Sequence, residues 1–205
     1  MTVTIEQLLH GGDVGEAARR ASERAVAAAR AQGLADISYS IEPSPLGNLV
    51  VAVTPRGLIR VAYGADERAD TVLDELARRV SPRVIEAPAA VDEVRRELDQ
   101  YFAGRRRHFD VPVDWRLVDP GFGRRVLRAT ARIPFGRVLT YKEVAAKAGS
   151  PRGSRAAGNA LGANRIPIVV PCHRVVRAGG VMGGYTGGVE RKEFLLELEG
   201  AELSA

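Results

Sequence analysis

The chain has 205 residues, of which 45% are hydrophobic and 27% charged, a composition typical of a globular protein with one large or two small cores. It has no apolar stretch of membrane-spanning length, and residues 1–10 lack the basic and apolar regions of a signal peptide, so we expect a cytoplasmic protein. One cysteine excludes an internal disulfide and, with three scattered histidines, gives no zinc-binding spacing, so we expect no metal.

The net charge of +5 is unevenly distributed. Residues 1–114 carry 15 Arg and Lys against 18 Asp and Glu, whereas residues 115–205 carry 15 against 7. A general richness in arginine is the simpler explanation, but the first half is equally rich in arginine and is acidic overall. A basic second half therefore indicates a polyanionic partner, most simply nucleic acid.

The first half alternates predicted strands and helices. Residues 5–32 have a helical pattern interrupted at Gly11–Gly12, and we treat residues 1–36 as an extension of unknown role. Three strands with short connections predict an antiparallel meander, and two helical stretches follow. The strands are expected at 37–41, 48–53 and 58–63, and the helices at 66–80 and 88–102, the latter with a stripe of Val91, Val94, Leu98 and Phe102.

A basic run at residues 105–107 precedes an extended, proline-containing segment. Contact with DNA phosphates is one interpretation of this run, and a solvated loop is the simpler one. We place a domain boundary near Asp114, which gives a scaffold domain at 37–114 and a second domain at 115–205.

The second domain begins with a predicted helix. Asp119 is expected to cap it, with Pro120 at the first helical position, and Pro134 is expected to end it. The residues that form its apolar stripe are Phe122, Val126, Ala129 and Ile133.

Two short helices then follow in a pattern that predicts a helix-turn-helix. Thr140 and Glu143 form a capping box for a helix at 141–148, and Ser150–Pro151 is expected to cap a second helix at 152–161. On that second helix, Arg152, Arg155 and Asn159 are spaced to share one face, and such side chains suit phosphates and base edges.

The sole cysteine lies in the segment Pro171-Cys172-His173-Arg174-Val175. A thiol becomes a nucleophile when a base or positive surroundings lower its pKa. His173 is the candidate base, and Arg174 and Arg177 are the nearby positive charges. On an extended segment, neighbouring side chains point apart, so water or a turn would have to connect Cys172 with His173. A carboxylate is needed to orient the histidine, and Glu197 and Glu199 are both placed for it.

A glycine-rich loop at residues 183–188 follows the cysteine. Its four glycines would let backbone amides approach a flat ligand, and Tyr185 offers a wall for that ligand. A flexible hairpin without a ligand is the alternative.

Pro-Cys-His-Arg-Val, the loop Gly-Gly-Tyr-Thr-Gly-Gly and the helix after it resemble the core of the O6-alkylguanine-DNA alkyltransferases, and the similarity covers about residues 37–200. The resemblance implies an α/β (α+β) fold. Its N-terminal domain would be a small antiparallel sheet with helices, ribonuclease-H-like, and its C-terminal domain would be winged-helix-like with a helix-turn-helix.

The resemblance also implies roles for individual residues. Cys172 would accept the alkyl group through a Cys–water–His173–Glu199 relay, Tyr141 would donate to the base, and Asn164 would support the thiolate. Arg155 would fill the gap left by a flipped nucleotide as its helix enters the minor groove. The remaining expected DNA contacts are Arg152, Asn159 and Ser150. The expected pocket residues are Tyr185, Thr186, Leu161, Val175, Pro167 and Lys192.

The activity implied is direct reversal of O6-alkylguanine damage, and of O4-alkylthymine damage, in double-stranded DNA by irreversible, stoichiometric transfer to Cys172 after base flipping. No cofactor is implied, and we expect a monomer, with association along DNA left open. A damage-recognition module with an inert cysteine, and a thiol hydrolase or redox sensor, are the competing hypotheses.

Overall fold

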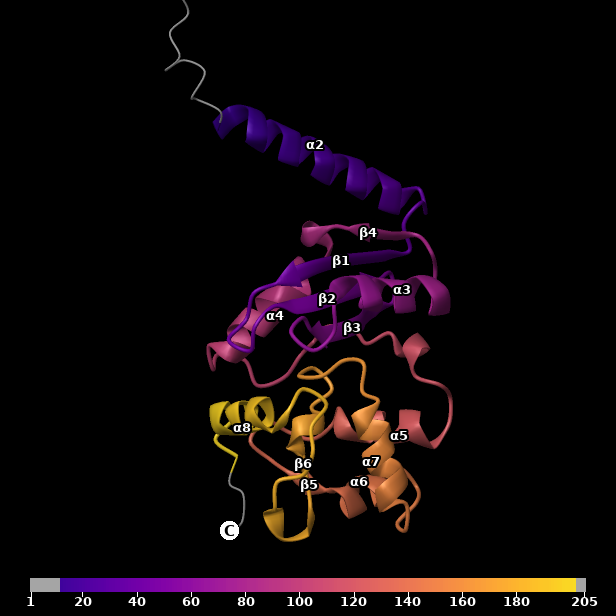
Figure 1. Cartoon of the computed structure of the whole chain (residues 1–205), viewed down its shortest axis with the longest axis vertical. Helices are drawn as coiled ribbons and strands as arrows, with labels where there is room; N and C mark the ends of the chain where they lie inside the picture. Colours follow the sequence, from indigo (N-terminus) through magenta and orange to yellow (C-terminus); the bar gives the residue numbers. More distant parts are fainter. Residues whose placement is uncertain (1–11, 202–205) are drawn as a thin grey trace, which may run out of the picture.

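The computed structural model describes residues 12–201, and its two halves lie one above the other, with the sheet in the upper half and most of the short helices in the lower (Figure 1). Residues 5–11 of the helix predicted at 5–32 lie outside the described residues. Its remainder forms α2 (Gly12–Ala31), which extends along the top of the molecule. None of the described helices is both long and apolar enough to cross a membrane.

The three predicted strands pair as an antiparallel meander and gain a fourth, so that the sheet order is β3-β2-β1-β4. The fourth strand, missed in the sequence because it has three residues, pairs in parallel with β1. The strands are β1 (Ile37–Glu42), β2 (Leu49–Thr54), β3 (Gly57–Tyr63) and β4 (Val84–Glu86).

Both faces of this sheet are buried, because alternate residues of its central strands point to opposite sides. Val50 and Ala52 pack with α3 (Ala69–Arg79) on one face. Val51 and Val53 face the other way, into a core that also contains residues of α4 (Asp92–Phe102) and of the second half of the chain. One hydrophobic core therefore runs from the sheet to the cysteine.

The segment predicted to link the halves is packed against the sheet. Pro112 accepts a hydrogen bond from Leu58, and buried Asp114 accepts one from Thr54 and pairs with Arg116. Two short 3-10 helices flank this region, at Pro88–Ala90 and Trp115–Leu117.

The second half contains a bundle of three short helices. They are α5 (Phe122–Thr130), α6 (Tyr141–Lys147) and α7 (Ser154–Gly162), with α6 and α7 packed on α5 and on each other. The capping box of Thr140 and Glu143 is confirmed. A two-stranded parallel sheet of β5 (Leu139–Thr140) and β6 (Val175–Val176), a 3-10 turn at Ala178–Gly180 and α8 (Val189–Leu198) complete the domain.

Two predicted helix starts are wrong. Asp119 does not cap α5, because Gly121 adopts a φ of 133° and takes the capping position, after which the helix begins at Phe122. Ser150 does not cap α7, because the chain turns once more before the helix begins at Ser154, with Gly153 in the capping position. Only the first of these two starts depends on glycine's conformational freedom, because Gly121 has a positive φ whereas Gly153 has a φ of −88°. The predicted α/β fold, with an N-terminal sheet domain and a C-terminal helical domain, is confirmed.

Candidate active site

The cysteine lies in a 3-10 turn, Cys172–Arg174, rather than in the extended segment considered from the sequence. Cys172 is 5% exposed, and β6 follows this turn directly, pairing with β5 at the entrance to α6. The turn holds the thiol at the base of a cavity while its two following side chains, His173 and Arg174, are directed into the interior.

The backbone before the cysteine is strained. Ile168 is buried and has a φ of 72°, a conformation that is rare for a β-branched residue, and the amide of Val169 donates to the carbonyl of Pro167 across it. Such a conformation persists only where the surroundings determine it fully. The strain therefore identifies this loop as one whose position is fixed by other contacts.

Asn164 supplies those contacts. Its side-chain Nδ2 donates to the carbonyl of Val170 at 2.8 Å and to Cys172 Sγ at 3.1 Å, while its Oδ1 accepts from the amide of Ile166 at 3.0 Å. One buried amide thus holds both ends of the strained loop and reaches the sulfur. The same hydrogen bond favours the thiolate over the thiol.

His173 and Glu199 form a buried pair behind the cysteine. His173 Nε2 lies 2.9 Å from Glu199 Oε1, and both side chains have no exposed surface. The other ring nitrogen, Nδ1, is buried and makes no hydrogen bond to any described residue, so it remains available as a proton acceptor. Glu199 is the C-cap residue of α8, and the alternative acid Glu197 is exposed.

The Glu199 carboxylate accepts hydrogen bonds from several groups besides His173. Arg174 binds both of its oxygens at 2.8 Å, and the hydroxyl of Tyr101 donates to Oε1 at 2.6 Å. The amide of Gly136 donates to Oε2 at 3.2 Å. Burial acts to raise the pKa of this carboxyl, but the hydrogen bonds and charges of His173 and Arg174 together outweigh it and lower the pKa to about 2. Glu199 is therefore a fixed anion and not a proton acceptor.

The electrostatic surroundings leave both reacting groups neutral before substrate binds. Burial raises the pKa of the Cys172 thiol to about 11, against the effects of the Asn164 hydrogen bond and the Lys192 charge. Burial lowers the pKa of His173, against the effect of Glu199. A buried neutral imidazole can accept the proton that a buried thiol must lose.

Lys192 lies beneath the glycine-rich loop and not in the cavity. Its Nζ donates to the carbonyl of Val175 at 2.6 Å and to that of Gly183 at 3.4 Å, and burial lowers its pKa to about 8. The lysine thereby joins β6 to the loop and places a positive charge near the sulfur. Val175 and Pro167, also expected in the pocket, are buried and are not among the residues that line the cavity.

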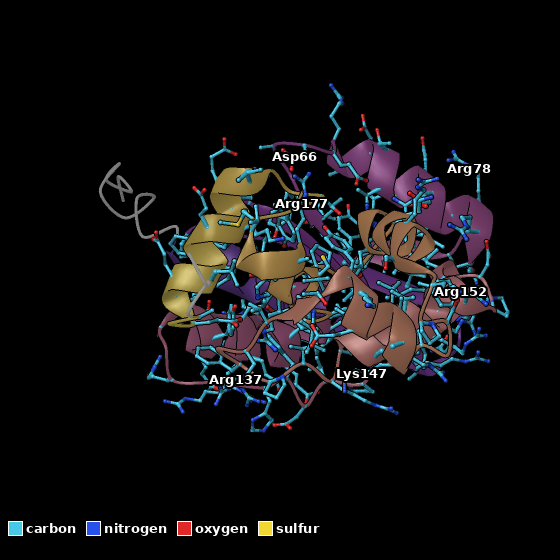
Figure 2. The ribbon with its side chains drawn as sticks, turned by 90° about the horizontal axis from the view of Figure 1, so that it is seen from below. Asp66, Arg78, Arg137, Lys147, Arg152 and Arg177 are labelled. Atoms are coloured by element: carbon cyan, nitrogen blue, oxygen red, sulfur yellow. The ribbon has the colours of Figure 1, made fainter. Side chains whose placement is uncertain are left out.

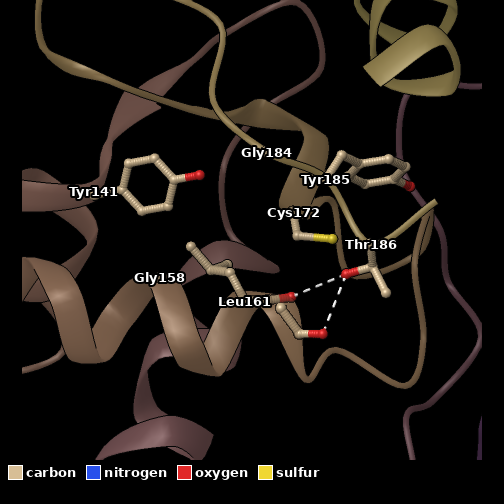
Figure 3. A pocket seen from close by; sticks show the side chains of 8 residues that line it. Tyr141, Gly158, Leu161, Cys172, Gly184, Tyr185 and Thr186 are labelled. Carbon is tan, nitrogen blue, oxygen red and sulfur yellow. Dashed lines mark hydrogen bonds between the residues drawn. The ribbon is translucent and has the colours of Figure 1, made fainter. Parts of the chain in front are cut away.

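The cavity above Cys172 has a volume of about 250 Å³. Figure 3 shows the sulfur on the same side as Tyr185 and Thr186, with Tyr141 across the cavity and α7 below. Thr186 Oγ1 donates to the carbonyls of Leu161 and Gly162, which attaches the glycine-rich loop to the end of α7. The residues that line the cavity are Tyr141, Gly158, Leu161, Gly162, Cys172, Gly184, Tyr185 and Thr186.

The residues expected to contact DNA lie on the outer surface next to this cavity. Arg155 and Asn159 are exposed on α7, one helical turn apart. Arg152 and Ser150 belong to the turn before α7, so Arg152 does not share the helix face assigned to it from its spacing. Figure 2 shows Arg152 and Lys147 projecting outward from this end of the molecule.

Sequence reasoning missed four residues of the site: Tyr63, Tyr101, Gly136 and Arg174. Arg174 was noted only as a positive charge near the cysteine, although its side chain turns away to bind Glu199. The two tyrosines belong to the half of the chain that was interpreted as a scaffold. No local pattern could have identified Tyr101, because its partner lies 98 residues further along the chain.

Comparisons with known proteins agree with this arrangement. The family domain described as "6-O-methylguanine DNA methyltransferase, ribonuclease-like domain" matches residues 37–115, and "6-O-methylguanine DNA methyltransferase, DNA binding domain" matches residues 121–201. A methylated-DNA–protein-cysteine methyltransferase of Methanosarcina acetivorans is 38% identical over 165 residues, which is 80% of this chain and 98% of the relative.

Solved structures give the same result. The O6-methylguanine methyltransferase of Mycobacterium tuberculosis superposes with a TM-score of 0.68 at 35% identity, covering 80% of this chain and 93% of that one. The structure of the M. tuberculosis protein in complex with DNA also has a TM-score of 0.68, at 36% identity, covering 80% and 92%.

The fold, the buried cysteine and the comparisons together define a DNA-binding protein that takes an alkyl group onto a cysteine of its own. The chain belongs to the 6-O-methylguanine DNA methyltransferase family. Its activity is that of a methylated-DNA–protein-cysteine methyltransferase, direct-reversal DNA repair by alkyl transfer, as the sequence predicted.

Proposed function

We propose that Cys172 is the acceptor and that its substrate is O6-alkylguanine in double-stranded DNA, with O4-alkylthymine as a second substrate. The observation that carries the assignment is the position of Cys172, the only cysteine of the chain, at a cavity beside α7 with Asn164 on its sulfur. A damage-recognition module with an inert cysteine would have no use for the buried histidine–glutamate pair behind that sulfur.

The reaction follows from the charges of the site. His173 takes the thiol proton, with a water molecule as the connection, and Glu199 and Arg174 keep the imidazole oriented as it becomes charged. The thiolate attacks the alkyl carbon, the S–C bond forms and the C–O6 bond breaks, leaving its electron pair on the guanine. Tyr141 stays protonated because burial raises its pKa, so its hydroxyl can donate to the base that leaves.

The product explains why each molecule would act once. A thioether at Cys172 is stable, and none of the residues around the sulfur provides a nucleophile that could displace the alkyl group. The protein is therefore consumed stoichiometrically, and the proposed chemistry uses no cofactor.

Access to the cysteine requires the damaged nucleotide to leave the duplex. Cys172 is 5% exposed at the base of a cavity, so it cannot reach the O6 atom of a stacked base. We infer that α7 enters the minor groove, that Arg155 fills the gap left in the stack, and that Arg152, Ser150 and Asn159 contact the backbone nearby. The chain would act as a monomer with domains at 37–114 and 115–205.

A single-turnover incubation tests the assignment of the acceptor. A duplex carrying one O6-methylguanine with a radiolabelled methyl group is mixed with excess protein, and the protein is then analysed by intact mass and peptide mapping. We expect one added methyl group per molecule, located in the peptide that contains Cys172. Tight binding of the duplex with no label on the protein would instead support the damage-recognition module.

Arg155→Ala should separate base flipping from chemistry. Removing the side chain that fills the stack should slow transfer from the duplex by roughly 10- to 100-fold, because extruding a base costs a few kcal/mol. Transfer from the free base O6-benzylguanine needs no flipping and should change less than about twofold. Arg78→Ala, which removes an exposed arginine from α3, is the matched control. An equal loss on the free base would contradict the role proposed for Arg155.

A further inference from the structure

Tyr185, which forms one wall of the cavity, is held from behind by the N-terminal domain. Its hydroxyl lies 2.7 Å from the hydroxyl of Tyr63, the last residue of β3. Figure 3 shows the Tyr185 hydroxyl directed away from the side where Tyr141 lies. The pocket wall is therefore attached to a residue that the sequence placed in a scaffold.

Tyr63 is itself rigidly placed. It is 4% exposed, and its carbonyl accepts hydrogen bonds from the amides of Asp66 and Glu67. The guanidinium of Arg191 lies 4.4 Å from the centre of its ring, donates to the carbonyl of Gly187 at 2.7 Å and forms an ion pair with Asp66. The position of the Tyr63 ring is thus fixed by the end of β3, by the turn that follows it and by the first part of α8.

The glycine-rich loop packs closely against the ring of Tyr63. A Cβ atom on Gly187 would lie 2.4 Å from Cε2 of Tyr63, so the loop backbone rests directly on the ring. The His173 ring also meets the Tyr185 ring edge to face, with the two centroids 6.3 Å apart. The Tyr185 ring therefore contacts two buried rings, those of Tyr63 and His173, and its hydroxyl has Tyr63 as its one hydrogen-bond partner among the described residues.

We propose that Tyr63 is a positioning residue for alkyl transfer, which sets the size of alkyl group that the cavity accepts by fixing the ring of Tyr185. The inference rests on the proposed acceptor role of Cys172. In this proposal, an alkyl group larger than methyl makes room for itself by displacing the Tyr185 wall, which breaks the hydrogen bond to Tyr63 and leaves two buried hydroxyls without partners. The hydrogen bond between Tyr63 and Tyr185 thereby opposes bulky alkyl groups, while it keeps the Tyr185 ring close to a methyl group.

The test compares two duplexes, one carrying O6-methylguanine and one carrying O6-benzylguanine at the same position, in single-turnover reactions with wild type and Tyr63→Phe. Phenylalanine keeps the ring against Gly187 and beneath Arg191 and removes only the hydroxyl. We expect the benzyl-to-methyl rate ratio to rise about threefold to tenfold, the range that one hydrogen bond can supply. Tyr39→Phe makes the same chemical change on β1 and should leave the ratio unchanged.

Tyr185→Phe and the double variant complete the cycle. If Tyr63 acts through Tyr185, the ratio in Tyr185→Phe should not change further when Tyr63→Phe is added. A lowered melting temperature with an unchanged ratio would overturn the proposal, because it would reduce Tyr63 to a contact between domains. Additive effects of the two changes would overturn it as well. Failure of wild type to methylate Cys172 is a separate outcome, and it would sink the proposed function instead.

Discussion

Cys172→Ala is expected to bind a duplex carrying O6-methylguanine as tightly as wild type does and to remove no methyl group from it. The side chain is buried, and its replacement leaves Asn164 Nδ2 bonded to the carbonyl of Val170, so the loop should keep its shape. Removing the nucleophile of a catalytic unit lowers the rate on the order of 10⁴-fold or more. Single-turnover transfer and fluorescence anisotropy, measured on the same preparation, check both halves of this prediction.

Two outcomes of the Cys172→Ala experiment would differ from this prediction. Label found on the Cys172→Ala protein would require an acceptor other than a thiol, since the chain has no second cysteine. Loss of binding together with transfer would show that the cavity had collapsed, and Cys172→Ser, which restores the volume, would then be used for the comparison.

Much of this site can be predicted from the sequence, because the reacting residues lie close together in the second half of the chain. The motif around Cys172 is recognisable because its residues are adjacent in the sequence, whereas the choice of Glu199 over Glu197 came from the family resemblance. The capping box at Thr140 is equally local, and the structure confirms it. Local patterns succeed where the partners of a residue lie within one turn of it.

Long-range partners could not be predicted in the same way. Tyr63 lies on a strand that is buried on both faces and Tyr101 lies on an amphipathic helix, and nothing near either residue in the sequence identifies its hydrogen-bond partner. Their hydroxyls become informative once the sheet and α4 are packed on the second half, where they meet Tyr185 and Glu199. The two wrong helix starts have a different origin. Gly121 adopts a positive φ and takes the capping position of α5, and before α7 the chain makes one more turn, closed by a hydrogen bond from the amide of Gly153 to the carbonyl of Ser150.

Glu199→Gln is expected to lower the stability of the folded protein. Glutamine keeps the shape of the side chain but removes the charge that buried Arg174 is paired with, and breaking a buried ion pair in this way costs about 3–5 kcal/mol. For a protein of this size that corresponds to a melting temperature lower by roughly 6–20 °C. Differential scanning calorimetry on both proteins measures it, with Glu197→Gln, an exposed acid on the same helix, as control.

The difference in stability between wild type and Glu199→Gln should decrease as the pH is lowered into the acid range. The folded-state pKa of Glu199 is about 2, below its value in the unfolded chain of about 4.3. Its contribution is therefore fully present above about pH 4.3 and is lost as the pH falls through about 2. The gap between the two melting temperatures should stay constant around neutral pH and narrow in acid.

The rate of transfer gives the more direct evidence on function, measured at a temperature where both proteins are folded. Without the carboxylate to orient and stabilise the imidazolium, the neutral-pH rate should fall about 100-fold or more. Glu199 also raises the pKa of His173 against the effect of burial, so its removal should lower that pKa further. The acid limb of the rate profile, where His173 becomes protonated and stops accepting the thiol proton, should then move to lower pH. A slower rate with an unmoved acid limb would mean that Glu199 supports the fold of α8 and does not act through His173.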